Sequence, residues 1–106
     1  MANIVSITFG VLNKTFPAMI LDAATLQSET ITSSASNQQS AAAPSTFGGP
    51  LVANIVTDTA IYVSAGTNPN VLTTEALKRK MIPAGGDVYV QVAAGHKIAV
   101  VNAECL

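Results

Sequence analysis

The side chains best suited to chemistry in this chain are one histidine and one cysteine. His96 lies in a Gly95-His96-Lys97 turn, with no second histidine or cysteine at metal-ligand spacing. Cys105 is the penultimate residue, and a chain end is a poor place to hold a nucleophile in fixed geometry. Covalent catalysis also needs a base and an orienting group, for which no diagnostic spacing is present. The pattern predicts an exposed turn histidine, an incidental thiol and no enzymatic activity.

The carboxylates are scattered along the chain: Asp22, Glu29, Asp58, Glu75, Asp87 and Glu104. Asp58 and Asp87 flank predicted strands, in turn positions where aspartate usually accepts bonds from local backbone amides. The doublets Gly48-Gly49 and Gly85-Gly86 lack the lysine and hydroxyl residue of a phosphate-binding loop. We therefore expect no catalytic, metal-binding or cofactor-binding residues, and no cofactor.

Lys78-Arg79-Lys80 is the one cluster of like charge. Nucleic-acid binding would require more basic charge and interleaved aromatic residues, whereas the net charge is −1 and aromatics make up 5%. No apolar run approaches the ~20 residues of a membrane-spanning helix. Two interpretations of the cluster remain, a solvated loop, which we favour, and a contact with an acidic protein surface. Lys78, Arg79 and Lys80 are thus candidate contacts for a protein partner, with neither nucleic acid nor membrane expected.

The composition indicates a small protein that is covered in part by other chains. Its 106 residues predict one domain, and 10% of them are charged against a usual ~25%. Hydrophobic residues make up 49%, many of them small alanines and valines that cannot all fit inside one core. We therefore expect a homo-oligomer, a trimer or a dimer. One cysteine excludes an internal disulfide, and the N-terminus lacks signal-peptide features, which predicts synthesis in a cytoplasm.

Short runs rich in β-branched and aromatic residues, bounded by Gly, Pro and Asn, predict strands. These runs are Ile4–Phe9, Ser28–Ser33, Leu51–Val56, Ala60–Ala65, Val88–Val92 and Ile98–Val101. We expect the last two to form a hairpin, and Gly10 to introduce a bend or bulge. The expected fold class is all-β, a small antiparallel β-sandwich of jelly-roll-like outline. At most one short helical turn is expected, within Thr73–Lys80.

Two segments leave alternatives open. Phe16–Leu21 contains Pro17, which argues against a central strand, and is too short to assign to a helix by periodicity. Ser34–Ser45 has the composition of a flexible linker. It also suits an extended segment whose alanines fit a tight place in a sheet.

A series of short motifs follows in order between residues 38 and 102. It consists of Gln38-Gln39-Ser40-Ala41-Ala42, Val52–Val56 with Thr57-Asp58-Thr59, Gly66-Thr67-Asn68-Pro69-Asn70, Ile82-Pro83-Ala84-Gly85, Tyr89–Val92 and Gly95-His96-Lys97-Ile98. This order resembles a small β-sandwich module of tailed-bacteriophage virion proteins, including cement or decoration proteins of the head. The chain departs from that pattern at His96, where the module usually has an acidic residue, and at Ala94, where it usually has proline. The loop after Asn70 is also longer and more basic. Since these departures lie in turns, they bear on the partner more than on the fold.

The resemblance implies a virion structural protein that binds the exterior of the capsid after synthesis in the host cytoplasm. The major capsid protein would be its partner, and the chain would clamp neighbouring subunits of the head lattice. Residues 1–21 lie outside the module and are the candidate capsid or subunit contact, through the apolar side chains Phe9, Phe16, Met19 and Ile20. An alternative function is a host-surface or glycan-binding module of a head or tail fibre. That function needs aromatic platforms, whereas Tyr62 and Tyr89 lie within predicted strands.

Overall fold

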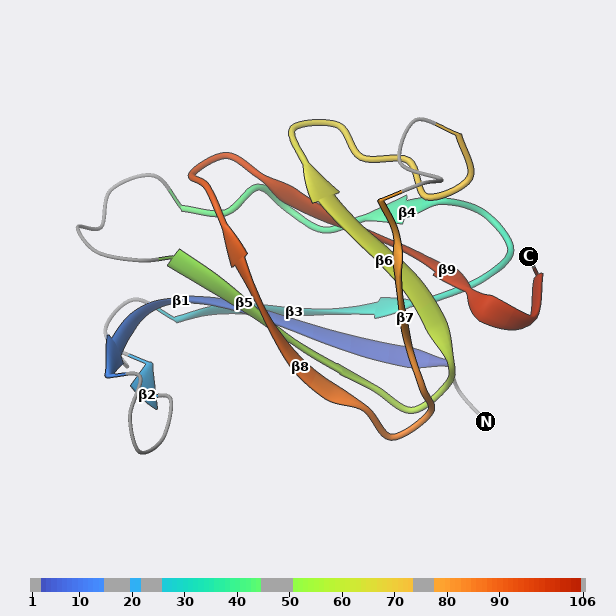
Figure 1. Ribbon diagram of the computed structural model, residues 1–106, viewed down its shortest axis with the longest axis horizontal. Helices are drawn as coiled ribbons and strands as arrows, with labels where there is room; N and C mark the ends of the chain where they lie inside the picture. Colours follow the sequence, from blue (N-terminus) through green and yellow to red (C-terminus); the bar gives the residue numbers. More distant parts are fainter. Residues whose placement is uncertain (1–2, 15–19, 22–25, 45–50, 74–77, 106) are drawn as a thin grey trace.

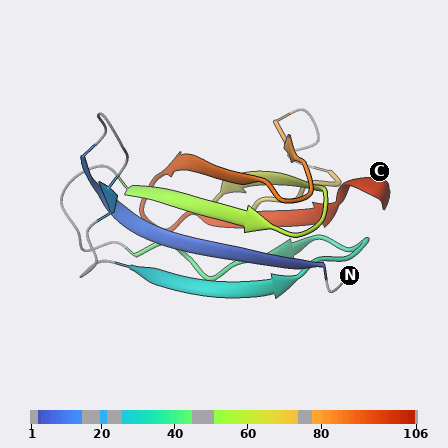
Figure 2. The same cartoon turned by 90° about the horizontal axis from the view of Figure 1, so that it is seen from below.

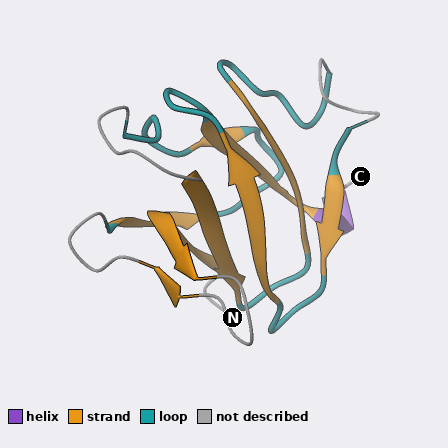
Figure 3. Ribbon diagram, turned by 60° about the vertical axis from the view of Figure 1, so that its left-hand side comes forward, coloured by secondary structure: helices purple, strands orange, loops and turns teal. Residues whose placement is uncertain are grey.

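The computed structural model describes residues 3–14, 20–21, 26–44, 51–73 and 78–105. In this part of the chain, strands form two antiparallel sheets that face each other (Figure 1). Their bounds are β1 Ile4–Lys14, β2 Ile20–Leu21, β3 Gln27–Thr32, β4 Gln38–Gln39, β5 Leu51–Thr57, β6 Ile61–Gly66, β7 Lys80–Ile82, β8 Asp87–Val92 and β9 Lys97–Asn102. A short 3₁₀ turn, Ala103–Cys105, follows β9 near the C-terminus (Figure 3). The predicted fold class, an all-β sandwich, is confirmed.

The first sheet has the order β3-β1-β5-β8, with β2 pairing to the far end of β1. Figure 2 shows these four long strands side by side. The second sheet has the order β4-β9-β6-β7. The chain changes sheet after β3, β4, β5, β7 and β8, so most paired strands are distant in sequence. These crossings produce the jelly-roll-like outline.

Alternate residues of the strands build a core between the sheets, as expected when one face of each strand is buried. Val5, Ile7 and Phe9 of β1 point into this core and are at most 1% exposed. Ile55 from β5 and Ile61 from β6 meet them from the two sheets. The position of Phe9 corrects the expectation of a partner contact, because its ring is enclosed by its own chain. Its period-two spacing from Val5 and Ile7 accounts for the difference.

The second sheet is also covered on its outer face near β9. Ala99 and Val101 form a second buried cluster with Val71, and Tyr62 packs against it. Val71 comes from the loop after β6, which lies over the sheet here. Burial on both faces explains why β9 is almost continuously apolar instead of alternating.

Strands β8 and β9 do not pair with each other, so the predicted hairpin is wrong. β8 pairs with β5, whereas β9 pairs with β4 and β6 in the other sheet. The turn between them does reverse the chain, with Gly95 at a φ of 82°. Ala43 holds this turn, because its N–H donates to the carbonyl of His96 and its carbonyl accepts from the N–H of Gly95. Turn residues predict a reversal of direction, but they do not decide whether its two arms bond to each other.

The segment before β5 is extended, which resolves the alternatives for Ser34–Ser45 over its described residues. Gln38 and Gln39 pair with β9, and the N–H of Ser40 continues the pairing by donating to the carbonyl of Ile98 at 2.8 Å. Ala43 is 4% exposed, as expected for a small residue in a tight place. The linker interpretation is wrong here because these backbone groups are bonded to the sheet.

Three further local predictions have different outcomes. Gly10 pairs with Val52 in unbroken register, so β1 passes through it, and the irregularity falls between Leu12 and Lys14. Ile20–Leu21 forms β2, while residues 16–19 lie outside the described residues. The helical turn predicted within residues 73–80 lies partly outside them, and its last residue, Lys80, begins strand β7. Three residues are too few to reveal such a strand by alternation.

The turn between β7 and β8 depends on two adjacent glycines with different requirements. A Cβ atom on Gly86 would lie 2.5 Å from Cγ2 of Ile82 and 2.8 Å from the carbonyl oxygen of Pro83. We therefore expect Gly86→Ala to lower the free energy of unfolding by about 1–3 kcal/mol through overpacking. Gly85 has a φ of 78° but open space around it, so Gly85→Asn should cost less than about 1 kcal/mol. Urea unfolding of both variants tests the distinction, and equal costs would contradict it.

Candidate functional site

The outer face of the β3-β1-β5-β8 sheet carries a broad set of small polar side chains. They alternate with the core residues along each strand, and the registers place them beside one another. We name this surface the polar face; its polar members are Ser6, Thr8, Ser28, Thr30, Thr32, Asn54, Asp87 and Gln91. The exposed side chains of Ile4, Val56 and Tyr89 lie on the same face and also belong to it. Asp87 is the single charged residue among them. The face is thus well supplied with hydrogen-bonding groups and almost free of charge.

Several of these polar groups already bond to each other. Thr8 Oγ1 and Ser28 Oγ lie 3.0 Å apart across β1 and β3. Asn54 Nδ2 donates to Asp87 Oδ1 at 2.6 Å and to the carbonyl of Val88 at 3.3 Å. The one carboxylate thus accepts a hydrogen bond within the face but keeps its charge, so a partner that covers it must supply further donors. Hydroxyl groups can both donate and accept, so they suit varied partner groups.

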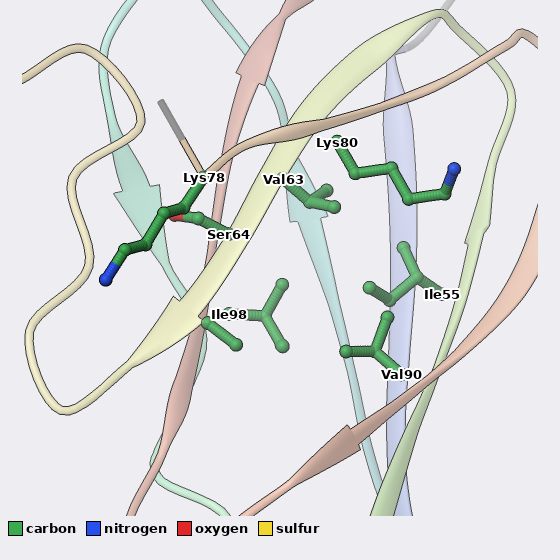
Figure 4. A pocket seen from close by; sticks show the side chains of 8 residues that line it. Ile55, Val63, Ser64, Lys78, Lys80, Val90 and Ile98 are labelled. Atoms are coloured by element: carbon green, nitrogen blue, oxygen red, sulfur yellow. The ribbon is translucent and has the colours of Figure 1, made fainter. Parts of the chain in front are cut away.

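A cavity of about 260 Å³ lies between the sheets on the side of β7 and β8 (Figure 4). Its walls are mainly apolar, with Ile55 and Val90 from the first sheet facing Val63, Ala65 and Ile98 from the second. It opens here because β7 pairs with only the first half of β6. The opposite side is bridged by side chains of β3, which bond to the backbone of residues 41 and 42. The side of the sandwich at β7 and β8 is therefore open, whereas the side at β3 is bridged by hydrogen bonds.

The side chains of the three basic residues do not gather in one place. Lys78 and Lys80 line the cavity, and Lys80 extends across its mouth above Ile55 (Figure 4). Arg79 lies on the other side, with its guanidinium carbon 4.7 Å from the centre of the Tyr62 ring. Its Nη1 atom also lies 3.5 Å from the carbonyl oxygen of Val71. The triplet is thus not one basic patch, because Arg79 supports the fold.

Ser64 also lines the cavity region, but its side chain points away from that of Val63 and beneath Lys78 (Figure 4). It is 7% exposed, and its hydroxyl has no hydrogen-bond partner among the described residues. This position follows from strand alternation, because Val63 faces the core and Ser64 the opposite side. We therefore give Ser64 no role in binding.

The remaining predicted residues have local roles or lie outside the described part. The Nδ1 atom of His96 accepts from the N–H of Ala93 at 3.2 Å, within the turn between β8 and β9. His96 is in a turn as predicted, but it is half-buried and not exposed. Ile20 lies in β2, whereas Phe16 and Met19 fall outside the described residues. The backbone of Cys105 ends the 3₁₀ turn.

The polar face was missed by our sequence reasoning, although a signal for it exists. Ser6, Thr8, Ser28, Thr30 and Thr32 occupy every second position of their strands. Our sequence analysis used these runs only to predict where strands lie. The sequence could not show that β1, β3, β5 and β8 share a sheet, which is what joins these residues into one surface.

Within the described ranges, no three His, Cys, Asp or Glu side chains are grouped as metal ligands would be. The same ranges hold no helix long and apolar enough to cross a bilayer. Comparison of the chain with protein-family models, with curated proteins and with solved structures found no match.

Proposed function

We propose that the protein is a structural protein of a tailed-phage virion, a cement or decoration protein that binds the exterior of the head lattice. The observation that carries the proposal is the polar face, which spans four strands with one charged residue. Contact with a coat-protein lattice would bury only one charge, and the cost of removing the hydroxyl groups from water is offset where the partner hydrogen-bonds to them. The motif order between residues 38 and 102 supports the same class of protein.

In this proposal the major capsid protein docks on the polar face, and hydrogen bonds to serine and threonine hydroxyls fix its orientation. A partner that binds the assembled lattice but not the free subunits stabilises the lattice by mass action. The protein acts by complementarity, without a chemical step. Lys78 and Lys80 lie at the separate cavity, so they are not required for this contact.

The first test is co-purification with virions of the protein's source on a density gradient. We expect the chain at a copy number comparable to that of the major capsid protein, measured by quantitative mass spectrometry. A copy number far below that of the coat protein would place it in the tail or at a vertex. Absence from intact particles would contradict the proposal.

A charge placed in the polar face should weaken binding to heads that lack this protein. Thr30 is exposed in the middle of β3, so Thr30→Glu should leave the fold intact. Its carboxylate would be buried without a partner in the complex, and we expect affinity to fall at least about tenfold. Co-sedimentation with purified heads measures the effect. The matched control is Ser36→Glu, an exposed position outside the face, for which binding should be unchanged.

The dependence of binding on salt concentration distinguishes contact through the polar face from contact through the basic residues. Binding through the polar face should change little between low and high ionic strength, because few charges take part. Binding through Lys78 and Lys80 to an acidic surface would weaken steeply with salt. Strong salt dependence together with unchanged binding of Thr30→Glu would move the contact from the polar face to the cavity rim.

A second candidate function, glycan binding by a head or tail fibre module, is favoured by one observation. Tyr89 is 41% exposed on the polar face, where its ring is available for stacking on a sugar. Clear signals on a glycan array that disappear in Tyr89→Ala would favour this function over lattice binding. Array signals unaffected by Tyr89→Ala would speak against stacking at this site.

A further inference from the structure

Strand β8 is the least protected sheet edge in the described part of the chain. It pairs there with β5 alone, in continuous register over six residues. Natural edges are usually blunted by lysine, proline, a bulge or short length. The residues of β8, Asp87–Val92, include no lysine or proline, whereas the edge strands β4 and β7 are two and three residues long. The other long edge, β3, carries a carboxylate, Glu29, that bonds to the N–H of Ala41 on the inner side, and an inward-pointing charge is one of the features that blunt an edge.

The outward backbone groups of β8 follow from its register. The N–H of Thr57 donates to the carbonyl of Gly86 at 3.1 Å at the start of the β5–β8 ladder. Hydrogen-bonded pairs recur at every second residue of an antiparallel ladder, so the even-numbered residues of β8 bond to β5. The odd-numbered residues 87, 89 and 91 direct their N–H and C=O groups away from it. A second strand could bond to this row.

The side chains of β8 match those of a second, antiparallel β8 when the pair is centred on Tyr89. Each Asp87 then lies opposite Gln91 of the second copy, so a carboxylate meets an amide donor. The two Tyr89 rings lie opposite each other on the outer face, and aromatic cross-strand pairs are favourable. A register centred on Asp87 would set two carboxylates opposite each other, which is unfavourable. The self-complementary register is therefore well defined.

The inner side of the same pair would complete the core. Val88 and Val90 are half-buried and pack against the core cluster next to the open cavity. In the register centred on Tyr89, Val88 of one copy lies beside Val90 of the other. The stem of Lys80 at the cavity mouth can pack on these added valines while its ammonium group stays in water. A second β8 would thus cover apolar side chains that a single copy leaves exposed.

We propose that two copies of this chain associate through their β8 edges, about a two-fold axis at Tyr89, into one continuous antiparallel sheet. The pairing joins two polar faces side by side and closes the open side of each sandwich. It uses the backbone edge of β8, whose outward side chains Asp87, Tyr89 and Gln91 also belong to the polar face. Self-association of the free protein is measured without any capsid present. It therefore stands or fails independently of virion binding, which the density-gradient experiment tests.

Cross-linking with a matched pair of single cysteines tests the position of the axis. In a Cys105→Ser background, Tyr89→Cys places thiols of the two copies opposite each other, within reach of a short bismaleimide. Thr30→Cys is the control, because it is equally central in the other long edge strand and also exposed. We expect dimer as the main product at position 89 and only background at position 30. Equal yields at the two positions, or none at either, would overturn the proposal.

Proline variants test the backbone pairing. Tyr89→Pro removes an N–H that faces away from β5, so the β5–β8 ladder stays intact while one bond to the second copy is lost. We expect sedimentation equilibrium to show a dimer for the wild type and an association at least about tenfold weaker for Tyr89→Pro. Thr30→Pro, the matched change in β3, should remain dimeric. A wild-type monomer at micromolar concentration, or a dimer unaffected by Tyr89→Pro, would overturn the proposal. If Tyr89→Pro does not fold, the cysteine pair decides the question.

Discussion

Replacing Phe9 with alanine is expected to lower the free energy of unfolding by about 3–5 kcal/mol. Phe9 is 1% exposed and is among the largest fully buried side chains of the described residues. Its removal leaves a cavity between two sheets whose backbones are held by their ladders and cannot collapse fully. Since a domain of this size is stable by only about 5–15 kcal/mol, the variant should unfold at much lower urea concentration. The urea midpoint and slope measure the change.

The control for Phe9 is Val56→Ala, a truncation on the exposed polar face. Val56 is 39% exposed, so this change should stay within about 0.5 kcal/mol. Similar costs for the two variants would show that Phe9 is not a core residue. A large loss of partner binding with unchanged stability in Phe9→Ala would restore its role as a contact.

Replacing Ser33 with alanine is expected to cost about 1–3 kcal/mol. The Ser33 hydroxyl donates to the side-chain oxygen of Asn102, and both residues are at most 5% exposed. This bond joins the end of β3 in one sheet to the end of β9 in the other. Without the hydroxyl, the buried oxygen of Asn102 loses its donor and cannot reach water easily. Thermal and urea unfolding measure the cost.

A double-mutant cycle separates this bond from general packing. Ser33→Ala and Asn102→Ala share one interaction, so the double variant should cost less than the sum of the two by about 0.5–3 kcal/mol. Ser36→Ala, in the exposed loop that follows, is the control and should be near neutral. If the free-energy costs of Ser33→Ala and Asn102→Ala simply add in the double variant, the hydrogen bond between the two side chains contributes nothing to stability.

Much of the fold was predictable because strand formation leaves a local pattern. Ile7 and Phe9 alternate with small polar residues, so both the strand and its buried side can be read from neighbours in sequence. The same reasoning located β3, β5, β6, β8 and β9 to within a residue or two. Strand β7 was not predicted, because three residues are too few to show an alternating pattern.

The candidate site was less predictable, for a different physical reason. Phe9 was assigned to the surface because it lies outside the 38–102 module, yet its strand is central to the first sheet. Lys78, Arg79 and Lys80 are adjacent in sequence, but Arg79 lies over the Tyr62 ring whereas Lys78 and Lys80 line the cavity. The turn at Lys78 and the start of β7 at Lys80 separate these side chains, so a charge cluster in sequence is no evidence of a charge patch.

The sequence by itself determined that this chain is built from short strands, where most of them lie and which of their residues are apolar. The tertiary structure alone decided that β8 pairs with β5 and not with β9, and therefore where the sheet ends and which side of the sandwich stays open. Alternation is a property of neighbouring residues, whereas strand partners are chosen by burial of side chains distant in the chain. The polar face and the free β8 edge both follow from that choice of partners.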